Sequence, residues 1–386
     1  MRKTSAILLA AALPMAVQAA NTEFSYGGYI KMDAMMSTYS DGDIGAASLG
    51  RDFYVPSATP TSGGTGEETS SVDFSAKSSR INFKTVTTTD SGDKVTGFVE
   101  MDFLGSAQGN EVVSNSYSPR LRHAFFTHNN LTVGQTWSTF MNVGALPETV
   151  DFLGVSDGTV FNRQAQIRYT MGDFQFALEN PETTLVTAPA APGAPGTLTT
   201  DDSGLPDIVA RYNLKTGDHA FTVAAIARQF AVQDGLQNGV DETANGFGVS
   251  LSGMVKLGAD DLKFSYTTGD VARYVGLAAA QDAIVDASGD IKATTVNAAF
   301  VAYRHFWNDK MRSTIAYSML DADYDDDAIA AGRVESSSST RLNLMYSPTK
   351  EVTYGVEYSM ATLEKVSTTK NEGDLNRLHF TAKYSF

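Results

Sequence analysis

The sequence predicts an all-β fold, a transmembrane antiparallel β-barrel of about sixteen strands with long extracellular loops and short periplasmic turns. Three observations predict it. Apolar and polar residues alternate in segments along the whole chain, the links between the segments are alternately short and long, and a secretion signal precedes the first segment. The alternative is a soluble β-sandwich or β-helix, which would not need links of alternating length.

The first twenty residues have the pattern of a secretory signal peptide. Arg2 and Lys3 precede an apolar stretch at 6–12, and residues 17–19 offer a cleavage site for signal peptidase. We therefore predict a signal peptide at 1–19 and an outer-membrane barrel domain at 20–386. A buried N-terminal helix is the alternative for the first segment.

The composition excludes several kinds of site and partner. The 386 residues carry a net charge of −15, which argues against a nucleic-acid partner. Cysteine is absent, which removes disulfides, thiolate catalysis and cysteine-based metal sites. We predict no cofactor and no metal site.

The expected strands follow from the period-two alternation of side chains. In the last strand, Leu378, Phe380 and Tyr384 share one face, whereas Arg377 and Lys383 lie on the other. The sixteen segments are expected at 24–37, 72–88, 94–103, 119–128, 130–136, 164–171, 173–180, 207–214, 218–229, 246–257, 261–270, 293–306, 310–321, 338–347, 351–362 and 375–386.

The links between these segments indicate the two rims. Short links rich in Gly, Asn, Asp or Pro fall at 89–93, 128–130, 171–173, 215–218, 257–260, 308–309 and 347–350. Long links fall at 38–71, 104–118, 137–163, 181–206, 230–245, 271–292, 322–337 and 363–374. Short turns on one rim and long loops on the other are typical of an outer-membrane barrel with both termini in the periplasm.

Acidic clusters lie in the long links, at 67–68, 201–202 and 325–327. Much of the negative charge is therefore expected at the outer rim, among outer-membrane lipid and lipopolysaccharide. These carboxylates either bind divalent cations that bridge them to anionic head groups or stay solvated.

Strand parity predicts which arginines face the lumen, because an arginine facing hydrocarbon at the bilayer midplane costs about 2–4 kcal/mol. Leu121 and Phe125 are expected to point outward, which places Arg120 and Arg122 inside. The same parity places five more arginines inside: Arg80, Arg168, Arg211, Arg341 and Arg377.

Two roles are open for these arginines. They either pair with the inward acids Asp33, Glu100, Asp102 and Glu179 and brace the wall, or they attract and orient anions in a pore. As a set, the inward bases outnumber the inward acids.

The link at 137–163 is the candidate constriction loop. Its apolar residues, such as Phe140 and Phe152, would be unwelcome on an exposed loop, and folding inward would bury them and narrow the channel. Glu148 and Asp151 would then face the arginine wall and create a transverse field. The alternative is an outer loop that packs on a neighbouring subunit.

Several motifs in the first half resemble the DcaP-like outer-membrane porin family. They are GYIKMD (28–33), EMDF (100–103), RLRHA (120–124), GQTWSTF (134–140), PETVDF (147–152), RQ with IRYT (163–164 and 167–170) and ENPE (179–182). The resemblance is close over 24–182, and beyond that only the barrel rhythm continues. Some members carry a helical coiled-coil extension before the barrel, whereas only a few residues are expected here between the cleavage site and the first strand.

The resemblance implies a homotrimeric channel for dicarboxylates and related small organic anions, with arginines at the constriction. By motif match, Arg120, Arg122, Arg163 and Arg168 would contact the anion. The expected function is passive diffusion of small hydrophilic solutes across a Gram-negative outer membrane, with preference for organic anions.

Two rival functions belong to other classes. A structural or adhesive barrel would have its lumen filled by paired side chains and would conduct almost nothing. An outer-membrane hydrolase would need a nucleophile and a base, and the sequence has neither a Gly-x-Ser-x-Gly nor a His-Glu-x-x-His motif. We therefore predict no catalytic residues.

Overall fold

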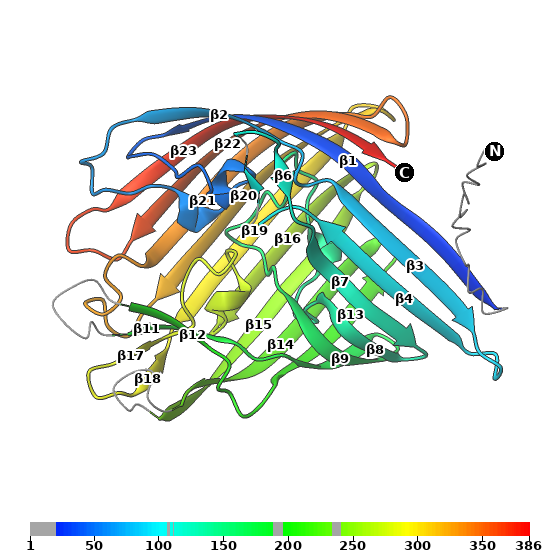
Figure 1. Cartoon of the computed structure of the whole chain (residues 1–386), viewed down its shortest axis with the longest axis horizontal. Coiled ribbons are helices and arrows are strands. Elements are labelled where there is room, and N and C mark those ends of the chain that lie inside the picture. The colour runs from blue at the N-terminus through cyan, green and yellow to red at the C-terminus, as the bar shows by residue number, and fades with distance from the viewer. Residues whose placement is uncertain (1–20, 106–108, 111, 188–195, 234–240) are drawn as a thin grey trace, which may run out of the picture.

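The computed structural model describes residues 21–105, 109–110, 112–187, 196–233 and 241–386 and shows a closed antiparallel β-barrel (Figure 1). The signal peptide predicted at 1–19 lies outside the described residues. The wall strands are β1 (Thr22–Tyr39), β2 (Thr69–Ser75), β3 (Arg80–Thr88), β4 (Lys94–Asp102), β7 (Arg120–His128), β8 (Leu131–Trp137), β9 (Arg163–Met171), β10 (Phe174–Glu179), β13 (Asp207–Thr216), β14 (His219–Val232), β15 (Glu242–Leu257), β16 (Asp260–Gly269), β19 (Thr295–Phe306), β20 (Met311–Asp323), β21 (Val334–Tyr346), β22 (Val352–Lys365) and β23 (Glu372–Ser385).

The barrel has sixteen wall strands, which we call staves, because β2 and β3 both pair with β1 and together make one stave. β3 pairs with residues 22–29 of β1 and β2 pairs with residues 33–39 of the same strand. The single strand expected at 72–88 is therefore interrupted at 76–79. β23 pairs with β1 over residues 29–39 and closes the barrel. The prediction of sixteen antiparallel staves is confirmed.

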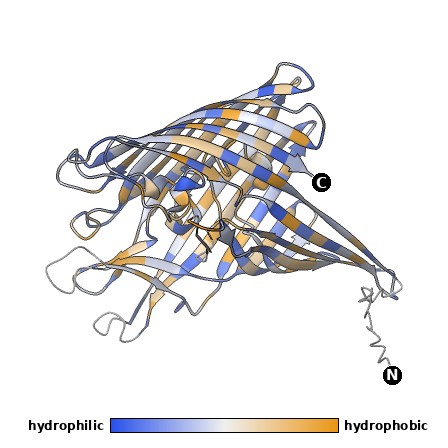
Figure 2. Ribbon diagram, turned by 45° about the horizontal axis from the view of Figure 1, so that its top comes forward, coloured by the Kyte–Doolittle hydropathy of each residue, from blue (hydrophilic) through white to orange (hydrophobic). Residues whose placement is uncertain are grey.

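The alternation of side chains along the staves separates the two faces. Ile167, Tyr169 and Met171 on β9 are exposed on the outer face, whereas Gln164 and Gln166 are buried on the inner face. Figure 2 shows apolar and polar residues alternating along the wall strands. The outward positions predicted for β9 are confirmed, because a lipid-facing surface requires apolar side chains at every second position.

The long loops carry small elements of their own. They are η1 (Leu49–Arg51), η2 (Pro56–Ala58), β5 (Gly109–Asn110), β6 (Ser116–Tyr117), η3 (Val143–Ala145), β11 (Thr183–Thr187), β12 (Gly196–Thr200), η4 (Ala272–Tyr274), β17 (Ala283–Val285) and β18 (Ile291–Ala293). No helix in the described ranges is long and apolar enough to cross a membrane. β12, β11, β17 and β18 form a separate four-stranded sheet, which lies at the end of the barrel away from the C-terminus (Figure 1).

Loop 3, residues 138–162 between β8 and β9, lies inside the barrel. Its backbone and side chains contact widely separated parts of the wall: Lys31 Nζ donates to the Val150 carbonyl (2.8 Å), Asn142 donates to Ser252 Oγ (3.0 Å), and the Gly158 N–H donates to Ser318 Oγ (2.7 Å). These contacts join β1, β15 and β20, so loop 3 crosses the lumen rather than projecting outward.

The apolar residues of loop 3 pack in the largest buried cluster of the described chain. Phe140, Met141 and Val160 lie in it together with Val271 and Tyr274 of loop 6, residues 270–294 between β16 and β19. Burying these groups stabilises the inward loop, because apolar surface removed from water is worth about 25 cal/mol per Å². The core of this barrel is thus made largely by loops that fill its lumen.

Candidate functional site

The first arginine group lies on β3 and β7 and is paired with two acids of β4. Arg122 Nε donates to Glu100 Oε1 (2.8 Å) and its Nη1 donates to Asp102 Oδ2 (2.9 Å). Arg120 donates two hydrogen bonds of 2.9 Å to Asp102, and Arg80 Nη1 lies 3.3 Å from Glu100 Oε1. All three arginines face inward as parity predicts, and each has a carboxylate partner.

A β-bulge explains how this group is assembled. The register between β4 and β7 pairs Glu100 with His123 but Met101 with Leu121, so Arg122 is the extra residue. Arg122 and His123 are consequently both buried. Leu121 points outward as expected, whereas the outward position expected for Phe125 is wrong.

Beyond the bulge the parity of β7 is reversed. Phe126 is exposed on the outer face, and Phe125 packs against Phe98 and His123, with ring centroids 5.6 Å and 6.3 Å away. A single extra residue transfers every later side chain of a strand to the other face.

Arg163 opens β9 at the extracellular end of the wall. Its guanidinium lies over the ring of Trp137 at 4.8 Å and near that of Phe161 at 5.7 Å. Trp137 is also 5.6 Å from the guanidinium of Arg122. A cavity of about 320 Å³ adjoins Arg163 and is lined in addition by Arg273, Asn162, Gln135 and apolar residues that include the outward Leu121. Arg163 shares strand parity with the outward Ile167, so only the family resemblance, and not parity, could have selected it.

Arg168 and Arg211 form a second group on β9 and β13. Arg168 donates to Thr139 Oγ1 (2.8 Å), Gln166 Oε1 (3.0 Å) and the Trp137 carbonyl (2.5 Å). Arg211 donates to Asn213 Oδ1 (2.8 Å) and the Met141 carbonyl (2.7 Å). Within the described ranges of the chain, neither guanidinium has a carboxylate at ion-pair distance, and Glu179 acts on Arg168 only from farther away, so neither positive charge is paired.

Arg341 and Arg377 are, like Arg122, almost fully buried. Arg341 Nη1 lies 3.2 Å from Glu357 Oε1, and both side chains are 1% exposed. Arg377 donates to Ser37 Oγ (2.8 Å) and the Gly50 carbonyl (2.5 Å). These contacts hold the inner wall and loop 1, residues 40–68, and leave neither group open to a solute.

Glu148 of loop 3 pairs with two arginines that the sequence analysis did not select. Arg312 donates to both of its oxygens (2.6 and 2.5 Å), and Arg304 Nη1 donates to Oε2 (3.1 Å). Burial opposes ionisation of Glu148, but the hydrogen bonds and charges of Arg312 and Arg304 outweigh it, and its pKa is below its usual value. Arg304 and Arg312 share parity with other inward residues, so the alternation on β19 and β20 could have found them.

Asp151 organises the turn of loop 3. Its carboxylate accepts from the backbone N–H groups of Tyr54 (2.8 Å), Leu153 (3.2 Å) and Gly154 (3.0 Å). Burial raises the pKa of this carboxyl, but the charge of Arg341 is the largest of several effects that together hold it below its ordinary value. The side of loop 3 that faces Arg80 and Arg122 instead presents a ring, Phe152, at 6.0 and 5.5 Å from the two guanidiniums.

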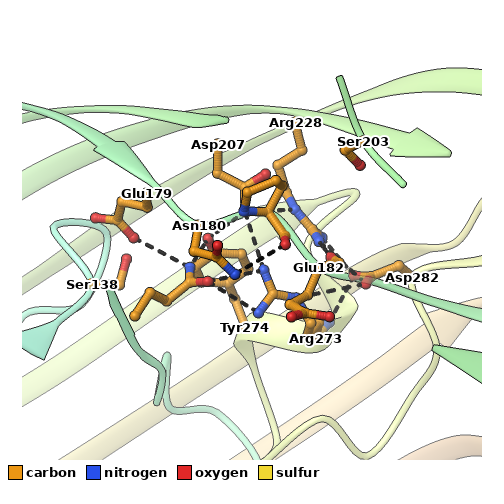
Figure 3. Close-up of polar contacts among 12 residues, drawn as sticks. Ser138, Glu179, Asn180, Glu182, Ser203, Asp207, Arg228, Arg273, Tyr274 and Asp282 are labelled. Atoms are coloured by element: carbon orange, nitrogen blue, oxygen red, sulfur yellow. Dashed lines mark hydrogen bonds and ion pairs between the residues drawn. The ribbon is translucent and has the colours of Figure 1, made fainter. Parts of the chain in front are cut away.

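Loop 6 carries charged residues that sequence reasoning missed. Arg273 and Asp282 meet Arg228 of β14 and Asp207 of β13 in a buried network (Figure 3). Arg228 could have been found from strand parity, since it lies on the opposite face of β14 from the exposed Val223. Arg273 and Asp282 lie in an irregular loop, where the sequence has no period from which to assign a face.

Comparisons with known proteins agree with this geometry. The model of the DcaP outer membrane protein family matches residues 13–386, which extends the resemblance beyond residue 182 to the second half of the barrel. The search of curated proteins gave no match.

Solved structures of outer-membrane proteins share the fold. The outer membrane channel DcaP of Acinetobacter baumannii has a TM-score of 0.75 at 22% identity, covering 95% of this chain and 98% of that one. OmpF of Salmonella typhi in complex with daunomycin has a TM-score of 0.55 at 10% identity, covering 95% and 98%. OmpT of Vibrio cholerae in its trimer form has a TM-score of 0.51 at 11% identity, covering 95% and 100%.

Proposed function

Because the chain belongs to the DcaP outer membrane protein family and forms an integral outer-membrane barrel, we propose that it is a passive channel that prefers small organic anions such as dicarboxylates. The observation that carries this proposal is the pair of lumen-facing arginines, Arg168 and Arg211, whose partners are neutral oxygens. Guanidinium groups that lack a carboxylate raise the concentration of anions near them and match carboxylate geometry.

Arg163 and the paired arginines add to this preference. Arg163 and Arg273 supply two guanidiniums to the cavity beside Trp137, and Asn162 and Gln135 supply carboxamides. Arg80, Arg120 and Arg122 are three cations against the two carboxylates of Glu100 and Asp102, which leaves one positive charge in excess. We infer that Arg120 and Arg122 contact the anion more weakly than Arg163, Arg168 and Arg211.

Selectivity measurements in a planar bilayer test the proposal. Under a gradient of potassium chloride, the reversal potential of the wild-type channel should indicate anion preference, and small dicarboxylates should block the current. The triple variant Arg163→Gln, Arg168→Gln, Arg211→Gln should move the reversal potential toward cation selectivity and weaken the block.

The control is Arg51→Gln, because Arg51 of loop 1 already pairs with two carboxylates, Asp43 of the same loop and Asp73 of β2. This change should leave selectivity as it is. A wild-type channel without anion preference, or a triple variant with unchanged selectivity, contradicts the proposal. A wild-type barrel with conductance near zero would instead favour the structural or adhesive barrel.

We also propose that the protein is a homotrimer. β8 and β10 have only 7 and 6 residues, fewer than the roughly 9–11 that a strand needs to cross the hydrocarbon core. A wall this low leaves loop backbone at bilayer depth, where it must be covered by protein. The exposed Phe174, Phe176 and Leu178 of β10 offer an apolar surface for that contact.

The OmpT structure is described as a trimer form, which agrees with this arrangement. Mass measurement in a mild detergent tests it and should give three chains per particle. Replacing Phe176 by Lys should dissociate the trimer, whereas Tyr317→Lys on β20, across the barrel, should not. A monomer in mild detergent would refute the proposal.

A further inference from the structure

Loop 6 is a second segment that lies in the lumen, beside the return limb of loop 3. Val275 forms an antiparallel bridge with Val160, and the Phe161 N–H donates to the Tyr274 carbonyl (2.8 Å). The rings of Phe140 and Tyr274 meet edge to face at 5.8 Å. The two loops thus cross the barrel side by side, although 115 positions separate the bridged residues, Val160 and Val275.

The inner part of loop 6 is withdrawn from solvent. Val271, Ala272, Tyr274 and Val275 are all 0% exposed. They belong to the same apolar cluster as Phe140 and Met141 of loop 3. A loop packed in this way is a fixed part of the lumen wall and reduces the open cross-section of the barrel.

A buried ionic latch holds loop 6 to the barrel wall (Figure 3). Arg228 of β14 donates to Asp282 Oδ1 (2.5 Å) and its Nε lies 3.4 Å from Asp207 Oδ2. The side chains of Arg228 and Asp282 are both 0% exposed. Arg228 also donates to the Glu182 carbonyl (2.8 Å), so the latch includes the loop between β10 and β13.

Residues next to the latch extend it along loop 6. Tyr274 Oη donates to Asp207 Oδ2 (2.6 Å) and Arg273 Nη2 donates to the same oxygen (3.1 Å). Asp282 accepts from the Arg273 N–H (3.0 Å) and from the N–H and hydroxyl of Thr184 (3.1 Å each). Two arginines and two aspartates therefore compensate one another away from water.

Such a network fixes position more than it adds stability. Replacing a buried ion pair by apolar residues of similar volume is often neutral or stabilising, whereas its directional bonds admit a single arrangement. Here the arrangement that satisfies Asp207, Arg228 and Asp282 is one with residues 271–282 inside the barrel.

We propose that loop 6 is a second wall of the constriction, and that the Arg228–Asp282 latch sets the size limit of the channel by holding that loop in the lumen. This inference rests on the proposed function, in that it assumes an open pathway for solutes. It concerns the width of that pathway, whereas anion preference concerns its charge, so the two are measured separately.

The first experiment compares Asp282→Asn with wild type by single-channel conductance and by liposome swelling with neutral sugars of increasing size. Loss of the latch should raise conductance about twofold or more, because the pathway's width limits conduction, and should admit larger sugars. Asp290→Asn is the control, since Asp290 is an exposed residue of the same loop whose one ion pair among the described residues is with Lys292. Both parameters should stay at their wild-type values in this control.

The second experiment separates release of loop 6 from general damage to the barrel. The sequence contains no cysteine, so Val160→Cys with Val275→Cys introduces one disulfide, and bridged neighbours have the Cα separation that a disulfide needs. In the Asp282→Asn background, oxidation should return conductance and size limit to wild-type values, and a reducing thiol should raise them again.

The outcomes discriminate clearly. Unchanged conductance and size limit in Asp282→Asn overturn the inference, and so does an oxidised cross-link that fails to restore them. If Asp282→Asn does not fold, the same cysteine pair in the wild type must oxidise completely without altering conductance, and failure to oxidise refutes the placement of loop 6. A wild-type channel with the expected size limit but no anion preference would refute the proposed function and leave this inference standing.

Discussion

Two groups of lumen arginines differ in the residues that lie opposite them on the neighbouring strand. Arg120 on β7 is in register with Asp102 of β4 and forms two hydrogen bonds with it. Arg168 on β9 is in register with Ala177 of β10, and Arg211 on β13 is in register with Gln175 of the same strand. The first arginine is neutralised across the strands and the other two are not.

The difference shows that an inward position and an available charge are separate properties. Side-chain parity places all three arginines in the lumen. Whether the charge acts on a solute depends on the residue directly opposite on the neighbouring strand, because opposite charges in direct cross-strand contact compensate each other. The paired group therefore stabilises the wall, whereas Arg168 and Arg211 remain available to anions.

Removing the carboxylate that Arg120 and Arg122 share should lower the stability of the protein more than any other substitution proposed here. Asp102 is 0% exposed and holds both Arg120 and Arg122, so Asp102→Asn leaves two guanidiniums without full compensation. We expect a loss of about 3–5 kcal/mol in the free energy of unfolding, the range for breaking one partner of a buried ion pair. Urea unfolding in lipid vesicles, followed by tryptophan fluorescence, measures it.

The control for this prediction comes from the other group. Arg168→Gln removes a cation that has no carboxylate at ion-pair distance in the described chain, and it should cost about 1.5–3 kcal/mol, the range for hydrogen bonds to charged groups. Equal losses in Asp102→Asn and Arg168→Gln would show that the two groups do not differ in the way the structure indicates.

Removing Glu148, the carboxylate that pairs with arginines of β19 and β20, should have a smaller effect on stability. Glu148→Gln removes the carboxylate partner of Arg312, whereas Arg304 keeps its ion pair with Asp261 (2.6 Å). The freed Arg312 should increase anion preference at neutral pH. The substitution should also cost about 1.5–3 kcal/mol of stability, the range for hydrogen bonds to charged groups. Reversal potential and urea unfolding measure the two quantities.

The pH dependence of the wild type gives a second measure of the same pair. Arginine neighbours overcome the effect of burial and depress the pKa of Glu148 in the folded protein, so its ion pairs are complete above the ordinary glutamate pKa of about 4.3. They are lost as the pH falls below that value through the depressed pKa. Wild type and Glu148→Gln should therefore differ in selectivity at pH 7 and converge in strongly acidic solution, and a constant difference would contradict the assignment.

The sequence predicts the wall of this barrel well because the signal is repeated at every second residue. Lipid on one side and a polar lumen on the other impose the period-two pattern on each stave. The pattern predicts inward positions for Arg168, Arg211 and Arg341. In the structure the first two contact loop 3 inside the barrel and the third is buried.

The sequence fails where that pattern is locally shifted or absent. The bulge at Arg122 reverses the parity of Phe125, and no composition signal marks it. Loop 6 has no period, and its inward position depends on the contact of Asp282 with Arg228, 54 residues apart in the chain. Contacts of this kind are tertiary, so a reading of local pattern cannot reach them.

Substitutions at the outer rim should have the smallest effect on ion selectivity. Asp325 and Asp327 are exposed in the loop between β20 and β21, beyond the end of the wall at Asp323. At physiological salt the Debye length is about 8 Å, so solvated charges farther than that from the constriction are screened. Asp325→Asn with Asp327→Asn should therefore leave the reversal potential unchanged, whereas Arg168→Gln with Arg211→Gln should shift it.

Lowering the salt tests the physical reason for this difference. At about 0.01 M ionic strength the Debye length rises to about 30 Å, and the rim substitutions should then increase anion preference, because two negative charges have come within range of the pathway. The effect of the arginine substitutions should persist at both salt concentrations, since those charges lie on the wall of the pathway itself. If the rim substitutions shift selectivity more than the arginine substitutions at physiological salt, then Arg168 and Arg211 only brace the wall, and charge outside the lumen controls which ions enter.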